Sequence, residues 1–421
     1  MMNGDWRPGG RGAVGRRGVI GGAAALGAAG MLGALARPAA AAQEVRLPFA
    51  NGVRPIAPAG MFPGKGEMIL QRVRAPLLET PWEVYRKHLF IPNDQAYVRW
   101  HIPDFPTEID VKTYRLRING EVERPFELTL DQLVKRFPAT QTAAVNQCSG
   151  NSRGFIDPRV PGAQWGHGAM YNALWTGVRL RDLLAHAGVK PGATHVAFHN
   201  IEQLIDPIPP HALFYKVLPL ARANDESTLV AYEMNRSELP LLNGFPIRLV
   251  VPGWYATYWV KMLTEITVTS HPGTGFWMNP AYTIPDTPNG SMKPGETGLK
   301  MVPINAMDPR SFVTSLVSGE KIPAHKSTVL RGFAFGGGSA LKSVAVSADN
   351  GASWKDAALG KDWGAYGSRE WHMAFTPGKP GPVRLMVRAA NAAGQVQPMV
   401  AGWNPGGFMY NAIEHVDVQA V

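Results

Sequence analysis

Apolar and polar residues alternate in short segments toward the C-terminal end of the chain. In "PVRLMVRA", residues 382–389, Val383, Leu385 and Val387 are separated by two arginines and a methionine, so one face of a strand would be apolar. Similar segments occur throughout the region that begins at about residue 305. They are separated by turn signals such as an Asn-Gly pair at 350–351, which is typical of a hairpin turn. The pattern predicts an immunoglobulin-like β-sandwich over residues 300–421.

The preceding region mixes two periodicities. Helical spacing predicts one short helix in 129–137, with Thr129 as its N-cap, and another in 178–189 that ends at Gly188. Because short helices and strands follow one another in irregular order, we expect an α+β fold rather than a regular βαβ array, with a mixed α/β domain over residues 96–290. The predicted strands of this domain are 114–120, 194–200 and 245–253.

The composition is that of a folded chain rich in strands and loops. Of 421 residues, 45% are hydrophobic and 18% are charged, and there are 46 glycines and 36 prolines, which excludes wholesale disorder. Residues 43–95 are Pro-rich and predict an irregular extension, with a short helix starting in "ETPWEVY". No GxGxxG or P-loop pattern follows a predicted strand, and no Lys/Arg-rich run occurs, so we expect no nucleotide or nucleic-acid partner.

The first 42 residues have the features of an export signal. Arg16 and Arg17 are adjacent, residues 18–36 are uncharged and only mildly apolar, and small residues precede a cleavage site at Gln43. This pattern favours the twin-arginine route and a periplasmic protein exported in its folded form; an ordinary secretory signal or a retained anchor is the alternative. Cleavage would remove five arginines and one aspartate, which lowers the net charge from +10 to +6. No later segment is long and apolar enough to span a membrane.

Cys148 is the only cysteine, in "VNQCSGNSRGF", residues 145–155, and it forms no intrachain disulfide. Its thiol is an inert buried group, a nucleophile activated by a distant histidine, or a metal ligand stabilised by Arg153 and loop amides. The 11 histidines are scattered, with no CxxC and no HExxH, which argues against a protein-only zinc or iron–sulfur site. One thiolate completes a metal site only if a cofactor brings the other ligands.

Residues 145–155, together with "AQWGHGAMYNALWTGVRLRDLL" (163–184), closely resemble the sulfite oxidase family of molybdopterin enzymes, and among them the bacterial periplasmic sulfite dehydrogenases. The resemblance runs from about residue 95 to the end and includes "YVRWH" (97–101), "LVAYEMNRSELPLLNGFPIRLVVPGWYATYWVKML" (229–263), "GFWMNPAYTIPD" (275–286) and "AGWNPGGF" (401–408). It implies a molybdopterin-binding domain of the sulfite oxidase type followed by a dimerisation-type sandwich. It also implies oxidation of sulfite to sulfate by oxygen-atom transfer.

The resemblance assigns roles to individual residues. In this family a pterin dithiolene and one protein cysteine bind molybdenum, so Cys148 is implied to be the metal ligand. Arg99, Arg153 and Trp165 match substrate-binding positions, Arg99 also being catalytic, and Tyr282 matches the active-site tyrosine. The positions that match residues holding the cofactor are Tyr97, His101, Asn243, Arg248, Val260 and Lys261. Taken alone, each has a structural explanation, such as a surface ion pair for Arg99 or a place in the core for His101.

One segment departs from the family pattern. Bacterial sulfite dehydrogenases usually carry a further substrate arginine in a segment like "WNPGGFMYN" (403–411), where the closest position here is Tyr410, and Gly406 and Gly407 are uncharged. This leaves open a related molybdopterin oxidoreductase acting on another oxo-transfer substrate, such as a sulfoxide. A secreted immunoglobulin-like binding protein with an inert cysteine is the non-enzyme alternative.

The expected electron acceptor is a separate protein. No CxxCH motif occurs, so no c-type haem is expected on this chain. The resemblance then implies a periplasmic cytochrome c as the acceptor, and either a homodimer or a heterodimer with a haem subunit.

Overall fold

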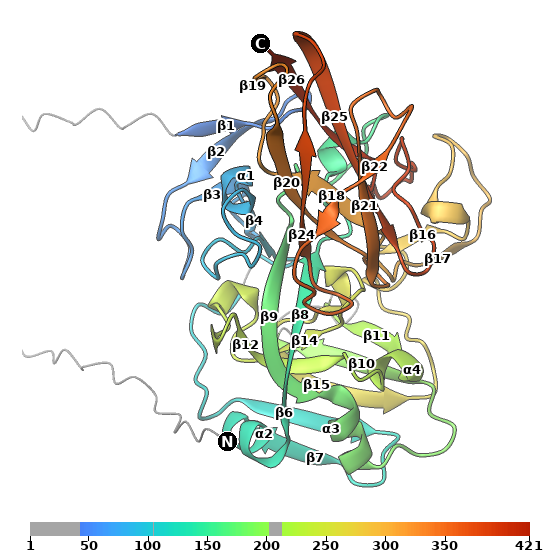
Figure 1. Cartoon of the computed structure of the whole chain (residues 1–421). Helices are drawn as coiled ribbons and strands as arrows, with labels where there is room; N and C mark the ends of the chain where they lie inside the picture. The colour runs from blue at the N-terminus through green and yellow to red at the C-terminus, as the bar shows by residue number, and fades with distance from the viewer. Residues whose placement is uncertain (1–42, 104, 202–212) are drawn as a thin grey trace, which may run out of the picture. The chain divides into compact units, whose positions relative to one another are not determined.

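The computed structural model describes residues 43–103, 105–201 and 213–421, which are traced in Figure 1. Strands dominate these residues, as the composition predicted, and helices are few, so the chain is mostly β where an α+β fold was expected. The predicted export segment, residues 1–42, lies outside the described residues. Within the described part of the chain, no helix is both long and apolar enough to cross a membrane. The α-helices are short, namely α1 (Trp82–Tyr85), α2 (Leu130–Arg136), α3 (Leu180–Ala187) and α4 (Leu220–Ala223).

The N-terminal region forms an antiparallel sheet, so the expectation of irregular structure over residues 43–95 is wrong, although the short helix predicted near Trp82 is confirmed as α1. Its strands have only two to five residues and are separated by turns, so no period-two pattern is long enough to read from the sequence. The sheet matters for function because β5 carries Arg99. In spatial order the strands are β1 (Glu44–Arg46), β2 (Val53–Ala57), β3 (Met68–Arg72), β4 (Leu77–Glu79) and β5 (Val98–Arg99).

Two further sheets build the middle of the chain and share one hydrophobic cluster. The first pairs β15 with β6 in parallel and its other neighbours in antiparallel fashion. Its order is β11 (Lys216–Pro219), β10 (His195–Asn200), β15 (Leu263–Thr269), β6 (Arg115–Gly120) and β7 (Phe126–Thr129). The second has the order β13 (Ser237–Glu238), β12 (Leu229–Met234), β9 (Met170–Arg179) and β8 (Ala139–Gln147), with β14 (Arg248–Val250) beside β12.

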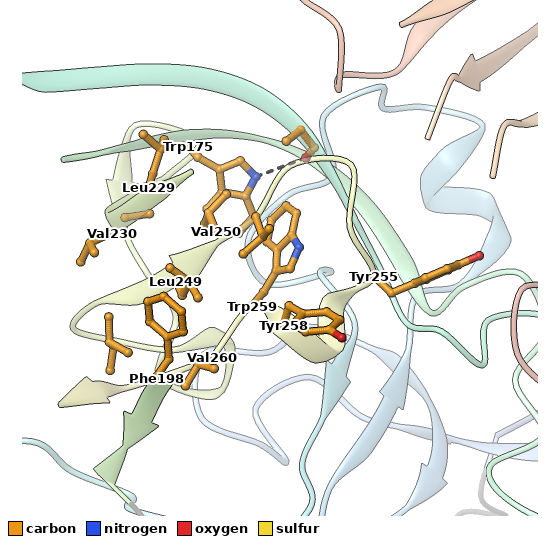
Figure 2. Packing of buried hydrophobic residues seen from close by; sticks show 14 of the residues in the cluster. Trp175, Phe198, Leu229, Val230, Leu249, Val250, Tyr255, Tyr258, Trp259 and Val260 are labelled. Atoms are coloured by element: carbon orange, nitrogen blue, oxygen red, sulfur yellow. Dashed lines mark hydrogen bonds between the residues drawn. The ribbon is translucent and has the colours of Figure 1, made fainter. Parts of the chain in front are cut away.

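The shared core is lined by bulky aromatic and aliphatic residues. Figure 2 shows Trp175 of β9 meeting Trp259, with ring centroids 5.5 Å apart, close to Leu229 and Val250. The Trp175 indole donates to the carbonyl of Ala144 in β8 at 3.2 Å, so the ring satisfies its one polar atom within the core. This packing fixes β8, and with it the residue that follows, Cys148.

The two predicted helices are confirmed, with their caps. Thr129 accepts from the Gln132 amide at 3.1 Å while the Gln132 side chain accepts from the Thr129 amide at 2.9 Å, which is a capping box. Helix α3 ends at Gly188, whose φ of +70° is open to glycine at little energetic cost. The predicted strands at 114–120 and 194–200 are confirmed as β6 and β10, whereas only the three residues of β14 are strand within 245–253.

The C-terminal region contains two more sheets, which share a second hydrophobic cluster. The predicted alternation is confirmed in β25, where Leu385 and Val387 are buried and Arg384 is exposed, although Met386 is buried too. A hairpin of β16 (Thr283–Pro285) and β17 (Met301–Pro303) precedes them. One sheet has the order β18 (Arg310–Val313), β20 (Thr328–Phe335), β24 (Arg369–Phe375) and β23 (Ala358–Leu359). The other has the order β19 (Lys321–Ile322), β26 (Glu414–Ala420), β25 (Gly381–Asn391), β21 (Leu341–Ser347) and β22 (Lys355–Asp356).

Candidate functional site

Cys148 lies directly after β8, at the start of a tight turn that a second loop holds in place. The Cys148 amide donates to the Ala169 carbonyl at 2.9 Å, and the Ser152 amide donates to the Gly166 carbonyl at 2.8 Å. In return, the Ala169 amide donates to the Asn151 side chain at 2.9 Å. The cysteine is free and buried, with 9% of the residue exposed, and these hydrogen bonds fix the backbone of the turn that carries it.

Cys148 lines a cavity with a water-accessible volume of about 50 Å³. The cavity gathers eight of the residues predicted for the site, from segments far apart in the chain. These are Tyr97, Arg99, His101, Cys148, Asn243, Arg248, Lys261 and Tyr282. The other lining residues are Trp100, Asn146, Ser149, Tyr171, Asn200, Phe214, Leu242, Ala256, Thr257 and Trp259.

Arg99 lines this cavity and carries an unused hydrogen-bond donor. Its Nη1 atom is buried and has no hydrogen-bond partner among the described residues, while its carbonyl accepts from Lys261 Nζ at 2.7 Å. The guanidinium carbon lies 6.0 Å from the centre of the Tyr282 ring. An unpartnered buried N–H costs free energy unless a ligand accepts from it, so Arg99 is suited to bind an oxyanion.

Tyr282 and His101 form a hydrogen-bonded pair in the cavity wall. Tyr282 Oη lies 2.9 Å from His101 Nε2, and the imidazole is packed between Phe214 and Trp277. Burial lowers the pKa of His101 well below its ordinary value, and the nearby Arg99 charge adds to this. Burial likewise raises the pKa of Tyr282. Both groups are therefore neutral at pH 7, and one proton is shared between a phenol and an imidazole.

Asn243, Arg248 and Tyr97 are held by hydrogen bonds within the wall. Arg248 donates to the carbonyls of Asn243 at 2.7 Å and Trp259 at 2.8 Å. The Asn243 amide group donates to the Tyr97 carbonyl at 3.0 Å, and Tyr97 Oη donates to Asn146 Oδ1 at 2.8 Å. Arg248 thus joins the backbone of two lining residues, Asn243 and Trp259, and brings its positive charge to the lining.

Three predicted residues lie outside the lining. Arg153 is buried and donates to the carbonyls of Ala163 at 3.0 Å and Gly406 at 2.9 Å, while its guanidinium carbon lies 5.3 Å from the Phe408 ring. Trp165 is packed against Tyr97. Val260 is buried, and its carbonyl accepts from Leu249. Their predicted roles in substrate or cofactor binding stay predictions.

Two buried lysines near the cavity were missed by reasoning from the sequence. Lys216 of β11 is fully buried between the rings of Tyr258 and Tyr282, with Nζ 4.7 and 4.8 Å from their centres, and donates to the Trp277 carbonyl at 2.6 Å. Lys65 donates to the Asn243 side chain and to two backbone carbonyls. Burial lowers the pKa of both lysines to about 7. A lysine inside the apolar run "FYKVLPL" was the available signal for Lys216; Lys65 lies in a Gly/Pro-rich segment that gives none.

The donor set fits a metal held partly by a cofactor. No group of three or more His, Cys, Asp or Glu side chains that could bind a metal occurs in the described ranges. Cys148 supplies one ligand, so a metal bound there would take its other ligands from a cofactor. Around it, Arg99 Nη1, Asn146 Nδ2 and Ser149 Oγ are buried and lack partners within the described part of the chain. Soft thiolate sulfur and unpaired donors suit an anionic, sulfur-ligated metal cofactor.

Comparisons with known proteins identify the domains and the family of this chain. Residues 101–277 match the model of the oxidoreductase molybdopterin binding domain, and residues 301–421 match the Mo-co oxidoreductase dimerisation domain. The two models together describe a molybdopterin oxidoreductase fold with its dimerisation domain. Sulfite oxidase of Gallus gallus is 32% identical over 355 residues, which cover 79% of this chain and 74% of that protein. The chain therefore belongs to the sulfite oxidase family, as the sequence motifs predicted.

Other relatives show how widely this architecture occurs. Mitochondrial sulfite oxidase of Rattus norvegicus is 33% identical over 82% of this chain, and the chain spans 64% of that protein's length. The NADH nitrate reductase of Volvox carteri is 30% identical over 82% of this chain and 42% of its own length. The structure of the sulfane dehydrogenase SoxCD from Paracoccus pantotrophus superimposes with a TM-score of 0.67 over 82% of this chain and 84% of that chain, at 24% identity. The last comparison supports the fold.

Proposed function

We propose that this protein is a molybdenum-dependent oxidoreductase that oxidises a sulfur compound, with sulfite, converted to sulfate, as the first candidate. The observation that carries the proposal is the meeting of the single cysteine with the unpartnered Arg99 donor in one cavity. When bound, the molybdenum cofactor supplies oxygen-atom transfer and takes up two electrons.

The chain's own residues have separate tasks in this proposal. Cys148 holds the metal through its thiolate. Arg99 binds an oxygen of the anionic substrate and keeps its charge when desolvated. Tyr282, paired with His101 at 2.9 Å, offers a neutral hydroxyl that orients a substrate oxygen. Arg248 and Lys261, both in the lining, place positive charge where an anionic cofactor phosphate would bind.

The proposal includes partners and location. In this proposal the electrons pass to a separate periplasmic c-type cytochrome. The arginine pair in residues 1–42 directs export of the protein. The match of residues 301–421 to a dimerisation domain supports a dimer, either of this chain or with a haem subunit. We retain the immunoglobulin-like class for the two C-terminal sheets, because they enclose one shared hydrophobic cluster.

A second candidate is a less charged sulfur substrate, such as a sulfane sulfur or a sulfoxide. It is favoured by Arg153, which lies outside the lining and donates through Nε to the Gly406 carbonyl and through Nη1 to the Ala163 carbonyl, so Nη2 alone takes no part in these bonds. Arg99 is then the one arginine of the lining with an unpartnered Nη atom among the described residues. A pocket with one available guanidinium discriminates less strongly for a dianion than a pocket with two or three.

Two measurements on one sample test the proposal. Elemental analysis of the purified protein should give about one molybdenum per chain, and sulfite should reduce added cytochrome c. Protein without molybdenum would overturn the assignment to this class of enzyme. Loaded protein that ignores sulfite, but turns over a sulfane compound with an electron acceptor or a sulfoxide with a reduced dye, would select the second candidate.

A further inference from the structure

A closed ring of four side chains joins the turn after Cys148 to the C-terminal sheets. Ser152 lies in that turn and His167 in the adjacent loop, whereas Arg310 begins β18 and Glu414 begins β26. Ser152 and Arg310 are fully buried, and the side chains of His167 and Glu414 are 19% and 15% exposed. None of the four lines the cavity.

Each member of the ring contacts the next. Arg310 Nη1 donates to Ser152 Oγ at 3.0 Å, and Ser152 Oγ lies 2.9 Å from His167 Nδ1. His167 Nε2 lies 3.3 Å from one Glu414 carboxylate oxygen, and the other accepts from Arg310 Nη2. Burial and the Arg310 charge lower the pKa of His167 well below its ordinary value. A neutral imidazole that accepts from the Ser152 hydroxyl and donates to Glu414 completes the ring.

Aromatic side chains enclose this ring. Phe155 stacks on the His167 imidazole at 4.4 Å with an 11° angle between planes. The Tyr410 ring lies 5.6 Å from the Arg310 guanidinium carbon. Tyr410, singled out in the sequence for a missing arginine, is therefore part of this cluster and not of the cavity lining.

The ring acts on the backbone that presents the thiol. The Asn151 amide donates to the Cys148 carbonyl at 3.0 Å, so residues 148–152 form one compact turn. Ser152 has a φ of +67°, a conformation that L-residues rarely adopt and that persists only when the surroundings enforce it. The C-terminal region contacts this turn at the Ser152 hydroxyl, through Arg310, and at the Ser149 carbonyl, which accepts from the Met409 amide at 3.0 Å.

We propose that Arg310 and Glu414 are positioning residues for Cys148. Through Ser152 and His167, side chains of the C-terminal sheets fix the turn from which the thiol reaches the cavity. The inference rests on the proposed function only for the identity of the metal bound by Cys148, because the order of the turn can be measured without it.

Glu414→Gln tests this role, because it preserves side-chain size while removing the charge that Arg310 and His167 contact. We expect amide hydrogen exchange in residues 148–154 to accelerate on the order of tenfold, the effect of losing one charge-assisted hydrogen bond. Labelling of the Cys148 thiol in cofactor-free protein should accelerate in parallel. Asp417→Asn is the matched control: it lies on the same strand and breaks a half-exposed pair with Arg384, so it should leave both rates unchanged.

Ser152→Ala removes the hydroxyl through which the turn contacts Arg310 and His167. It leaves the backbone strain at φ +67° unchanged. It should accelerate the same amides, and the double variant should not exceed the larger single effect, because both changes open one ring. Wild-type exchange in Glu414→Gln, or fully additive effects in the double variant, would overturn the proposal. If the wild-type protein as purified contained no molybdenum, the proposed function would be overturned, whereas faster exchange in Glu414→Gln would still support the positioning role.

Discussion

The cavity wall and the buried ring differ in how completely their polar side chains are paired, although Nε of Arg310 in the ring also lacks a partner among the described residues. In the wall, buried nitrogen and oxygen atoms of Arg99, Asn146 and Ser149 have no partner among the described residues. In the ring, Ser152 and Glu414 each contact two neighbouring side chains. Because an unpaired buried polar group destabilises a fold, the first arrangement persists where a ligand completes it, and the second holds structure. Substitutions in the two regions should therefore have different signatures.

The largest effect is expected at Cys148. Cys148→Ser exchanges a soft thiolate for a harder, less acidic hydroxyl, so sulfite oxidation should fall at least about a hundredfold while the circular dichroism spectrum stays that of the wild type. Steady-state turnover and molybdenum content on one preparation check this. Unimpaired turnover in a molybdenum-loaded Cys148→Ser protein would remove the thiol from the metal site.

Arg99→Gln is expected to have the second-largest effect, and it tests directly whether an unpaired donor of the cavity wall serves binding and not stability. Losing a charge-assisted hydrogen bond of about 1.5–3 kcal/mol should raise the sulfite KM by about tenfold to a hundredfold. The cofactor-free protein should lose little stability, because Nη1 has no partner in the described structure and the guanidinium approaches the Tyr282 ring only to 6.0 Å. Arg117→Gln, at a half-exposed arginine of β6, is the control for both readouts. An unchanged KM at fixed ionic strength would exclude Arg99 from the anion site.

Lys216→Met should change stability in a pH-dependent way. Burial lowers the pKa of Lys216 from 10.5 to about 7, so between these values the unfolded chain binds a proton that the folded chain does not. Wild-type stability then rises with pH across this window, and the burial penalty is complete below about pH 7. The advantage of Lys216→Met should therefore shrink by about 1–3 kcal/mol between pH 7.5 and 9.5.

Denaturant unfolding at both pH values measures that change. Lys65 titrates alike in both proteins and cancels from the difference. Lys342→Met, at an exposed position of β21, should show no such trend. A stability difference independent of pH would mean that Lys216 keeps its charge throughout.

Tyr282→Phe is expected to have the smallest effect. It keeps the ring that stacks on Phe408 with centroids 5.5 Å apart and removes only the hydroxyl shared with His101. We expect a KM rise of a few-fold and a visible loss of kcat, since a neutral donor contributes about 0.5–1.5 kcal/mol. Pre-steady-state and steady-state kinetics separate the two terms. A KM change as large as that of Arg99→Gln would make Tyr282 the main substrate contact.

Local chemistry decided what the sequence could predict. Thr129 and Gly188 mark helix ends because capping depends on a few neighbouring atoms, and both were predicted correctly. Family motifs singled out Cys148, Arg99 and Tyr282, and the structure brings these three residues into the lining of one cavity. By contrast, the strands between residues 43 and 79 are too short for a periodic pattern. Arg310, Glu414 and Lys216 matter through tertiary contacts that no local window contains.

The ring also bears on the order of assembly. Its members are separated by 158 residues between Ser152 and Arg310 and by 104 between Arg310 and Glu414, so closing it requires two long chain loops to form. Contacts of such high sequence separation form late in folding. We therefore expect the thiol-bearing turn to remain open in a nascent chain until β26 has docked. The site would then be most accessible to the cofactor before that docking. After docking, the closed turn would help to retain the metal.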